Sequence, residues 1–270
     1  MKLAFYTVLI STLIIGCNNT PELNDPIPQH KTFTIESKEL GEKRTINIWV
    51  PQEYTTNKDS LPVLYMPDGG LKEDFPHIAN TIEALIKAKK IPPIMLVGIE
   101  NTQRRRDLTG YTDVAKDKEI APVVGGSEKF RAFINNELFP SINKQYRTTN
   151  KKGIIGESLA GLFVTETFLL NSDMFNFYIA FDPSLWWNNQ YLLKVADEKL
   201  MNFPSSEKRF WFAGSSAEDI SSAAGQLHQI LAAKKIQNLA FKYSNEHNEK
   251  HNTIFRATKE KALIWTLNSN

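Results

Sequence analysis

The sequence is poor in cysteine and has no excess of charge of either sign. Cys17 is the only cysteine among 270 residues, which excludes an internal disulfide and any zinc site built from several cysteines. Lysine and arginine number 32 against 30 acidic residues, a net charge of +2. This balance gives no electrostatic case for nucleic-acid binding, which needs a basic patch or stripe.

The N-terminal apolar run is too short to span a membrane. After Met1-Lys2, residues 3–15 are mostly apolar and are followed by the small Gly16. A membrane-spanning helix needs about 17–25 such residues. A positive start, a short apolar run and a small residue are instead typical of a secretory signal peptide.

The position of the cysteine suggests what the signal peptide does. Ile14-Ile15-Gly16-Cys17 resembles the lipobox of bacterial lipoproteins, in which the cysteine is lipidated and becomes the new N-terminus. This resemblance implies export and a lipid anchor on a bacterial membrane, on the periplasmic side or at the cell surface. The alternatives are a plain signal peptide or an uncleaved anchor with an incidental cysteine. Residues 18–30 are polar with three prolines, which predicts a flexible tether.

The remainder has the composition of one soluble domain. Apolar residues make up 41% and charged residues 23%, close to an ordinary globular protein. The length allows one or two domains, but no second linker, internal repeat or low-complexity tract follows residue 30. We therefore expect a single domain over residues 31–270.

Strand-like and helix-like segments alternate along this domain, which predicts an α/β fold with a mostly parallel sheet and helices on both faces. Thr32–Ser37 and Thr45–Val50 flank Gly41 and predict an antiparallel hairpin at a sheet edge. Pro140 predicts a kink or break in a helix. Further strands are expected at 62–66, 94–99, 153–156, 177–181, 209–213 and 239–243, and helices at 78–86, 130–146, 159–170, 190–200, 217–235 and 251–267.

The most specific stretch is Gly156-Glu157-Ser158-Leu159-Ala160-Gly161, where a strand ends and a helix begins. It matches the nucleophile elbow of α/β hydrolases, usually written G-x-S-x-G, with Ala160 in place of the second glycine. Ser158 is therefore the candidate nucleophile. The alternative is a turn of small residues that serves only packing.

A serine nucleophile needs a histidine base, and in this fold the base comes last in the chain. His30 and His77 precede Ser158, and His228 falls within a helix-like segment. His251, which precedes the final helix, is the preferred base, with His247 as the alternative.

The acid that orients the base should follow a strand between Ser158 and the histidine. Glu218 is the first choice and Asp219 the second, because both follow the strand at 209–213. Either acid can also simply stabilise the start of the next helix. Asp182, at the end of the preceding strand, is a third candidate.

The oxyanion hole should use the backbone N–H of Leu159 and one from the loop after the third strand. That loop contains Gly69 and Gly70, which allow the backbone to approach a ligand closely. An ordinary Asp-Gly turn is the alternative interpretation. Neither a metal nor a cofactor is implied.

Over residues 31–267 the chain resembles the bacterial esterases of the esterase D type, which include siderophore-ester hydrolases such as enterochelin esterase. The resemblance implies an α/β-hydrolase fold, with Ser158 as nucleophile and His251 as base. Glu157 and Ala160 depart from the family pattern, where histidine and glycine are usual. The matching segments are 66–70, 98–100, 104–109, 125–130, 137–142, 146–147, 156–163, 182–187 and 251–255.

Three further residues are candidates for substrate binding. Trp186 and Trp187 follow the sixth strand and can wall a pocket, although either can instead belong to the core. Arg106, within the run Arg104–Arg106, can attract an acidic substrate, with a solvated charge run as the alternative.

These observations predict a membrane-tethered serine esterase acting on a small-molecule or glycan-linked ester, such as a siderophore, feruloyl or acetyl ester. Two alternatives remain. One is an acyltransferase of the mycolyltransferase kind, and the other is a catalytically inactive surface lipoprotein that only binds its ligand.

Overall fold

The structure, a computed structural model, describes residues 25–268. The leader segment, Cys17 and most of the expected tether lie outside the described residues. Among the residues described, no helix is both long enough and apolar enough to cross a membrane.

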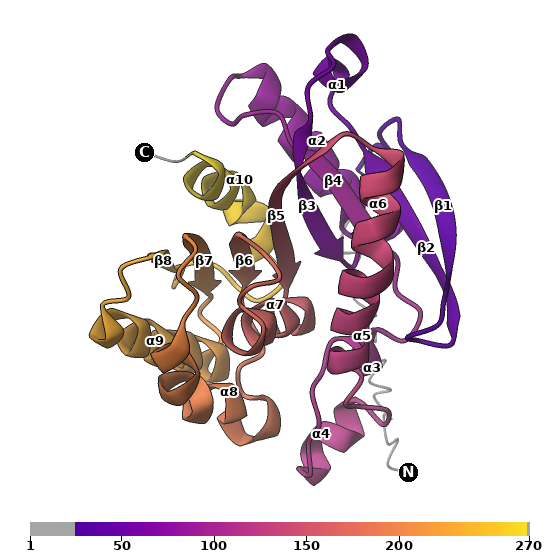
Figure 1. Cartoon of the computed structure of the whole chain (residues 1–270). Coiled ribbons are helices and arrows are strands. Elements are labelled where there is room, and N and C mark those ends of the chain that lie inside the picture. Colours follow the sequence, from indigo (N-terminus) through magenta and orange to yellow (C-terminus); the bar gives the residue numbers. More distant parts are fainter. Residues whose placement is uncertain (1–24, 269–270) are drawn as a thin grey trace, which may run out of the picture.

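The described chain forms one eight-stranded sheet with the order β1-β2-β4-β3-β5-β6-β7-β8 (Figure 1). β1 and β2 form the predicted antiparallel hairpin, and β2 also pairs antiparallel with β4. All other neighbouring strands are parallel. The strands are β1 Lys31–Ser37, β2 Glu42–Trp49, β3 Leu61–Pro67, β4 Met95–Ile99, β5 Thr148–Glu157, β6 Phe177–Phe181, β7 Lys208–Gly214 and β8 Leu239–Asn245.

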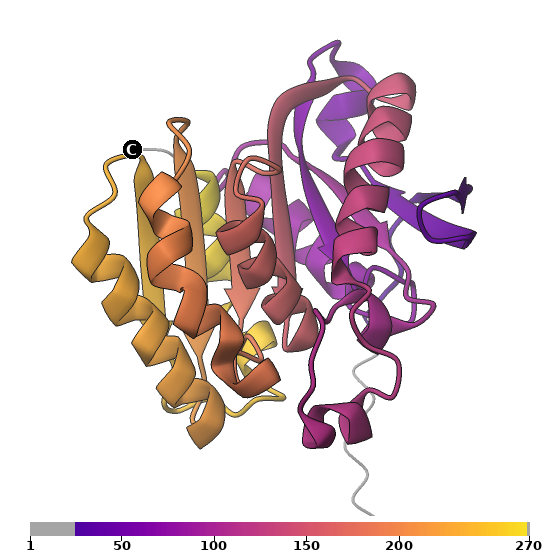
Figure 2. The same cartoon turned by 60° about the horizontal axis from the view of Figure 1, so that its bottom comes forward.

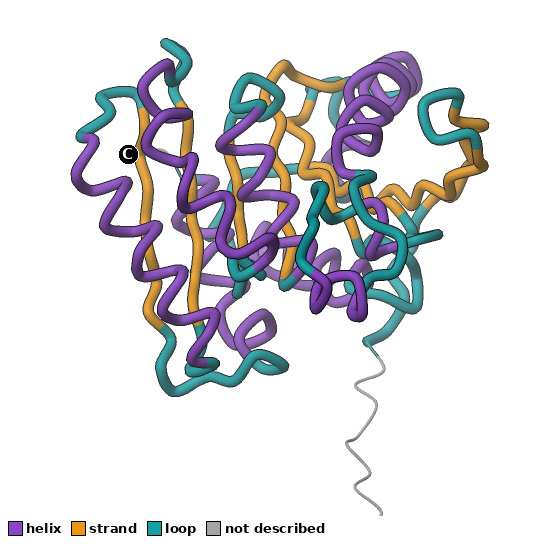
Figure 3. Tube along the Cα trace, turned by 90° about the horizontal axis from the view of Figure 1, so that it is seen from below, coloured by secondary structure: helices purple, strands orange, loops and turns teal. Residues whose placement is uncertain are grey.

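Helices cover both faces of the sheet, as predicted from the alternating pattern (Figures 2 and 3). Helices α2 and α10 pack on one face, and α5 to α9 pack on the other. The helices are α1 Gln52–Thr56, α2 Phe75–Lys87, α3 Arg104–Asp107, α4 Ala115–Ile120, α5 Ser127–Phe133, η1 Ile134–Leu138, α6 Phe139–Gln145, α7 Leu159–Leu170, α8 Trp187–Lys199, η2 Leu200–Asn202, α9 Glu218–Lys234 and α10 Ile254–Leu267.

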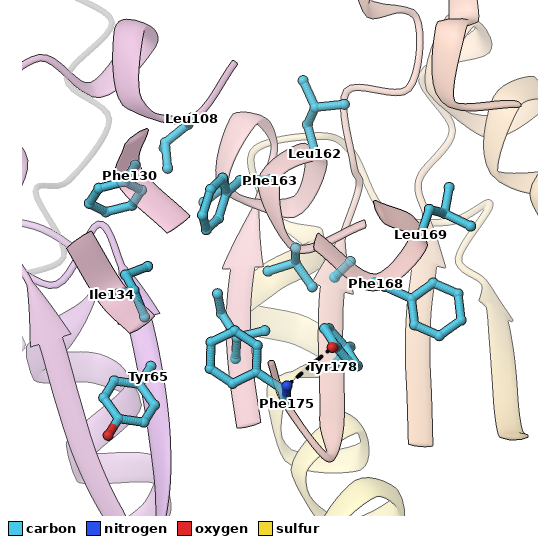
Figure 4. Packing of buried hydrophobic residues seen from close by; sticks show 14 of the residues in the cluster. Tyr65, Leu108, Phe130, Ile134, Leu162, Phe163, Phe168, Leu169, Phe175 and Tyr178 are labelled. Atoms are coloured by element: carbon cyan, nitrogen blue, oxygen red, sulfur yellow. Dashed lines mark hydrogen bonds between the residues drawn. The ribbon is translucent and has the colours of Figure 1, made fainter. Parts of the chain in front are cut away.

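The central strands β3, β4 and β6 are apolar along their whole length because both faces are buried. In β3, Val63 and Tyr65 contribute to the core on the α7 face, whereas Leu64 and Met66 contribute to the core under α2 and α10. Figure 4 shows the first of these cores, where Phe163 of α7 lies across from Phe130 of α5 and Phe168 of α7 lies near Tyr178 of β6. Burial of this apolar area fixes α7, and with it the turn that precedes α7.

The helix predicted across Pro140 continues through that residue without a break. Proline lacks the N–H that an α-helix interior requires. The structure accommodates it with a π-helical turn, η1, directly before α6, so that Pro140 lies in the first turn of α6. A change of hydrogen-bonding register thus replaces the break that the sequence predicted.

Residues 25–30 contain no helix or strand, but they contact the domain. Arg256 of α10 forms an ion pair with Asp25 at 2.5 Å. Asn80 of α2 donates a hydrogen bond to the carbonyl of Pro26 at 2.8 Å. The last part of the expected tether therefore packs on the α2–α10 face.

Candidate active site

Ser158 lies in a tight turn between β5 and α7. Its backbone has φ 59° and ψ −117°, a left-handed conformation that costs free energy for any residue other than glycine. A side chain at Gly156 would come within 2.7 Å of Ala160. Glycine at 156 therefore provides the space that allows alanine at 160, where the family pattern has glycine.

The serine hydroxyl is hydrogen-bonded to a histidine. The Oγ of Ser158 lies 3.1 Å from Nε2 of His251, which is in the turn before α10. The alternative base, His247, is exposed on the β8–α10 connection. The structure thus brings together the two residues that the sequence placed first as nucleophile and base.

Asp182 holds the other side of the histidine ring. Its Oδ2 lies 2.6 Å from Nδ1 of His251. Since a carboxylate accepts, Nδ1 carries the proton and Nε2 is free to accept from the serine hydroxyl. The ring is therefore oriented as a base toward Ser158.

Asp182 is itself fixed by Ser215 at the end of β7. The backbone N–H and the hydroxyl of Ser215 both donate to the Asp182 carboxylate, at 2.6 and 2.7 Å. Asp182 is fully buried, so these bonds replace the solvation that burial removes. Its hydrogen bond and negative charge raise the pKa of His251 above the usual 6.5.

The expected acids, Glu218 and Asp219, do not contact the histidine. Both are exposed in the first turn of α9. The Asp219 carboxylate accepts the neighbouring N–H of Ile220 at 3.0 Å, although the residue still borders the cleft around Ser158. Asp182, the third candidate, contacts the histidine instead, because it directly follows β6, the neighbour of β5 in the sheet.

Three neighbouring strands end in the same unusual way. Asp68, Ser158 and Asp182 directly follow β3, β5 and β6, and all three have a positive φ. Arg104 donates two hydrogen bonds to Asp68, at 2.6 and 2.7 Å. The polar groups at the carboxyl ends of these strands, which we call the catalytic edge, are therefore held by strained turns and by hydrogen bonds from neighbouring side chains.

Comparison with known proteins identifies this architecture. Residues 37–267 match the sequence profile of a family described as "Putative esterase". The chain belongs to this esterase family. Its mostly parallel sheet also confirms the predicted α/β-hydrolase fold, which it shares with an IroE-like serine hydrolase from Shewanella oneidensis. That crystal structure has a TM-score of 0.80 and 24% identity, over 88% of this chain and 79% of the other.

Two relatives of known sequence are named as siderophore esterases. The ferri-bacillibactin esterase BesA of Bacillus subtilis is 28% identical over 87% of this chain and 91% of its own length. The siderophore triacetylfusarinine C esterase of Aspergillus fumigatus is 27% identical over 63% of this chain and 61% of its own length. The predicted activity, a serine esterase that hydrolyses carboxylic esters, is confirmed by these findings.

Two of the three expected oxyanion-hole donors, the N–H groups of Gly69 and Gly70, already have hydrogen-bond partners within the protein. Leu159 begins α7, so its N–H belongs to the first turn, which has no carbonyl partner within the helix. By contrast, Gly69 N–H donates to the carbonyl of Ile99 at 3.0 Å, and Gly70 N–H donates to the Glu73 carboxylate at 2.6 Å. A side chain at Gly69 would lie 2.3 Å from Gly98, so this glycine serves the close packing of the loop against β4.

The three candidate substrate-binding residues lie in different places. Trp186 borders a cleft of 540 Å³ that contains Ser158 and His251. Trp187 is buried and borders a neighbouring hollow instead. Arg106 does not line the cleft, because its guanidinium is paired with Glu42 and Asp107, both at 2.7 Å.

Glu157, next to the nucleophile, adds an unusual carboxyl group to the catalytic edge. Burial raises its pKa to about 8, and the negative charge of Asp74 adds to the effect. Its own negative charge in turn contributes to the raised pKa of His251. The sequence showed Glu157 only as a departure from the usual histidine, which gave no indication of this role.

Neither Ser215 nor the Asp68–Arg104 pair was predicted from the sequence. Ser215 could have been considered, since it directly follows β7 at the same edge as Ser158 and Asp182. In the described part of the chain, no cluster of histidine, cysteine or carboxylate residues is arranged to hold a metal ion.

Proposed function

We propose that Ser158, His251 and Asp182 are the catalytic triad of this esterase and that its substrates are siderophore esters. The main support is the continuous hydrogen-bonded chain from Ser158 through His251 to the buried Asp182. It combines nucleophile, base and orienting acid in the geometry that acyl transfer requires.

In the first half of the reaction, Ser158 Oγ attacks the ester carbonyl carbon while His251 Nε2 takes its proton. The N–H of Leu159 stabilises the negative charge on the carbonyl oxygen, with help from its position at the start of α7. The C–O ester bond then breaks, and the imidazolium returns the proton to the departing alcohol. The acyl group is left on Ser158.

In the second half, water replaces the alcohol. His251 takes a proton from the water as its oxygen attacks the acyl carbon, and then returns the proton to Ser158 Oγ. A carboxylic acid is released. Asp182 stays ionised throughout and stabilises the imidazolium formed in each half-reaction.

The replacement Ser158→Ala tests this mechanism. Removal of the attacking oxygen should lower kcat on p-nitrophenyl acetate by about 10⁴-fold or more, because only the binding and oxyanion contributions remain. The folded structure should be retained, as judged by circular dichroism and melting temperature. Turnover close to that of the wild type would refute the assignment.

The proposed substrate class is supported by the two named siderophore esterases. It is tested by assaying bacillibactin and triacetylfusarinine C, each with and without iron, beside feruloyl and acetylated-glycan esters. We expect kcat/KM to be highest for a siderophore, by about tenfold or more. A preference for a feruloyl or acetyl ester would overturn the substrate class and leave the triad unaffected.

We also propose that the esterase is exported and anchored by a lipid on Cys17. The support is the lipobox-like sequence around Cys17, which lies outside the described residues. Cells fed a labelled fatty acid should incorporate the label into the wild type and not into a Cys17→Ala variant. Equal labelling of both proteins would overturn this proposal.

A further inference from the structure

A second hollow, larger than the catalytic cleft, lies on the α7–α8 face of the sheet. Its volume is 850 Å³, against 540 Å³ for the cleft. Residues of α5 and η1 form one side, residues of α7 and α8 form the other, and Gly110 and Tyr111 border it. We call this hollow the side groove.

A single segment of chain, Trp186–Asn189, separates the side groove from the cleft. Trp186 and Asn189 border the cleft, whereas Trp187 and Asn188 border the groove. Since residues next to each other in the sequence border the two hollows, the wall between them is one chain thick. A molecule bound at Ser158 needs only to pass over this wall to enter the groove.

The wall is held in a strained conformation. Asn188, Asn189 and Gln190 have φ values of 49°, 51° and 62°, three left-handed residues in succession. Hydrogen bonds to other segments hold the wall in place: Asn188 N–H donates to the Asp117 carboxylate at 2.8 Å, and Trp187 Nε1–H donates to the carbonyl of Gly110 at 3.1 Å. Such strain persists only where the surroundings enforce it, and it gathers at ligand sites.

The inner end of the groove offers an unused hydrogen-bond donor. Arg131 is 7% exposed, and its Nη2 lies 3.4 Å from the Glu166 carboxylate, which also accepts from Ser127 at 3.0 Å. The other terminal nitrogen of Arg131, Nη1, is buried and has no partner among the described residues. A buried N–H without an acceptor is costly, so a ligand oxygen that reaches Nη1 after a small shift of the guanidinium would remove that cost.

The outer end of the groove offers aromatic surface. Tyr111 and Tyr191 border it and are 68% and 43% exposed. Exposed aromatic side chains beside a hollow provide faces on which a flat ring can stack. Glu128, Glu166 and Asp173 outnumber Arg131 among the charged residues of the groove, which disfavours a strongly anionic occupant.

We propose that the side groove binds the part of the ester substrate remote from the scissile bond. The occupant is a flat, ring-bearing arm that stacks on Tyr111 and Tyr191 and ends in an oxygen acceptor for Arg131. The inference rests on the proposed siderophore esterase function, because it requires a substrate large enough to reach both hollows. The groove then determines which large esters are selected, while small esters use the cleft alone.

Two variants alter the groove without touching the triad. Tyr191→Ala removes a stacking face, and Ala132→Trp fills the groove from α5. Their matched controls are Met201→Ala, an exposed apolar residue elsewhere, and Lys129→Trp, an exposed position of α5 that does not line the groove. Arg131 is left unchanged, because loss of a buried partner of Glu166 can unfold the protein.

The kinetics of all four variants are measured on bacillibactin, whose arms end in flat catechol rings, and on p-nitrophenyl acetate. We expect Tyr191→Ala and Ala132→Trp to raise KM for the siderophore about tenfold, with kcat changed less than about twofold. Both controls should match the wild type, and p-nitrophenyl acetate should be cleaved equally by all.

Two results would overturn the inference, and they can be told apart. If the wild type cleaves the siderophore and the groove variants keep its KM, the groove proposal alone fails. If the wild type cleaves p-nitrophenyl acetate but not bacillibactin, the groove proposal fails because its occupant is not a substrate, and if it cleaves no other siderophore either, the proposed substrate class fails as well.

Discussion

Asp182 and Glu218 both follow a strand of the sheet, but only Asp182 contacts His251. Asp182→Asn keeps the shape of the side chain, removes its charge and favours the wrong tautomer of the histidine. We expect kcat on p-nitrophenyl acetate to fall by about 10²–10⁴-fold. The matched control Glu218→Gln should stay within about twofold of the wild type, since this exposed acid touches no catalytic group. A larger loss in Glu218→Gln than in Asp182→Asn would reverse the assignment.

Glu157 should make stability depend on pH. Its pKa is about 8 in the folded protein against 4.5 as the ordinary value, so the folded state holds this proton more tightly than the unfolded state. The free energy of unfolding should therefore decrease as pH rises from about 4.5 to about 8. In Glu157→Gln this contribution is absent, and we expect the variant to gain on the order of 2–4 kcal/mol over the wild type between pH 5 and pH 9.

Urea unfolding of both proteins at pH 5 and pH 9 measures this difference. A constant gap between the two proteins at all pH values would show that Glu157 ionises normally. Its neighbours Asp68, Asp74 and Asp182 are the same in both proteins, so their titration largely cancels in the comparison.

The candidate site could be predicted from the sequence where its requirements are local. The elbow around Ser158 needs small residues within a few positions, and the chain order of the fold indicates His251. The acid depends instead on which strand lies beside β5 and on a left-handed backbone at Asp182, with φ 45°. Neither the strand order nor the positive φ can be predicted from the local sequence, because Asp182 is not a glycine.

At the scale of the elements, the pairing of β5 with β6 depends on one missing side chain. Gly153 lies opposite Phe177, and a Cβ at Gly153 would come within 1.8 Å of the Phe177 ring. Gly153→Ala should therefore lower the free energy of unfolding by about 1–3 kcal/mol or more, since a packed core cannot absorb the overlap. Thermal or urea unfolding measures the loss.

Gly225, in the middle of α9, is the matched control. A Cβ there would meet no atom within 4 Å. Gly225→Ala should stabilise the protein by about 0.5–1 kcal/mol, because alanine loses less backbone freedom in a helix. Equal effects of the two substitutions would contradict the packing role of Gly153.

The elements that sequence patterns predicted are those with a continuous or periodic apolar face. The buried strands and α7 agree closely with the expected ranges, because burial on both sides of the sheet leaves little choice of residue. The first half of β5, Thr148–Lys152, is polar and was not predicted. Helices α1, α3 and α4 were also not predicted, since four to six residues cannot display a helical period.

On the scale of the whole molecule, residues 25–30 connect the two helices of one face. Besides the contacts of Asp25 and Pro26, the His30 ring packs edge-on against Phe75 with centroids 6.1 Å apart. The free energy of unfolding should be about 1–2 kcal/mol lower for a chain that starts at residue 31 than for one that starts at residue 25. Turnover of p-nitrophenyl acetate should be the same in both. Identical melting temperatures would mean that these contacts contribute nothing in solution.

The two ends of the described chain lie at opposite ends of the parallel strands, one near their carboxyl ends and the other near their amino ends. Asp25 is paired with Arg256, five residues after His251, at the catalytic edge. At the other end of α10, Asn268 donates to the carbonyl of Lys90, shortly before β4 begins (Figure 1). A carrier protein or a solid support joined directly to Asp25 would therefore stand beside the opening to Ser158 and obstruct bulky esters, whereas an anchor at Cys17 is separated from Asp25 by seven residues. Attachment through the other end would leave the opening free, which makes that end the better choice for immobilising the enzyme.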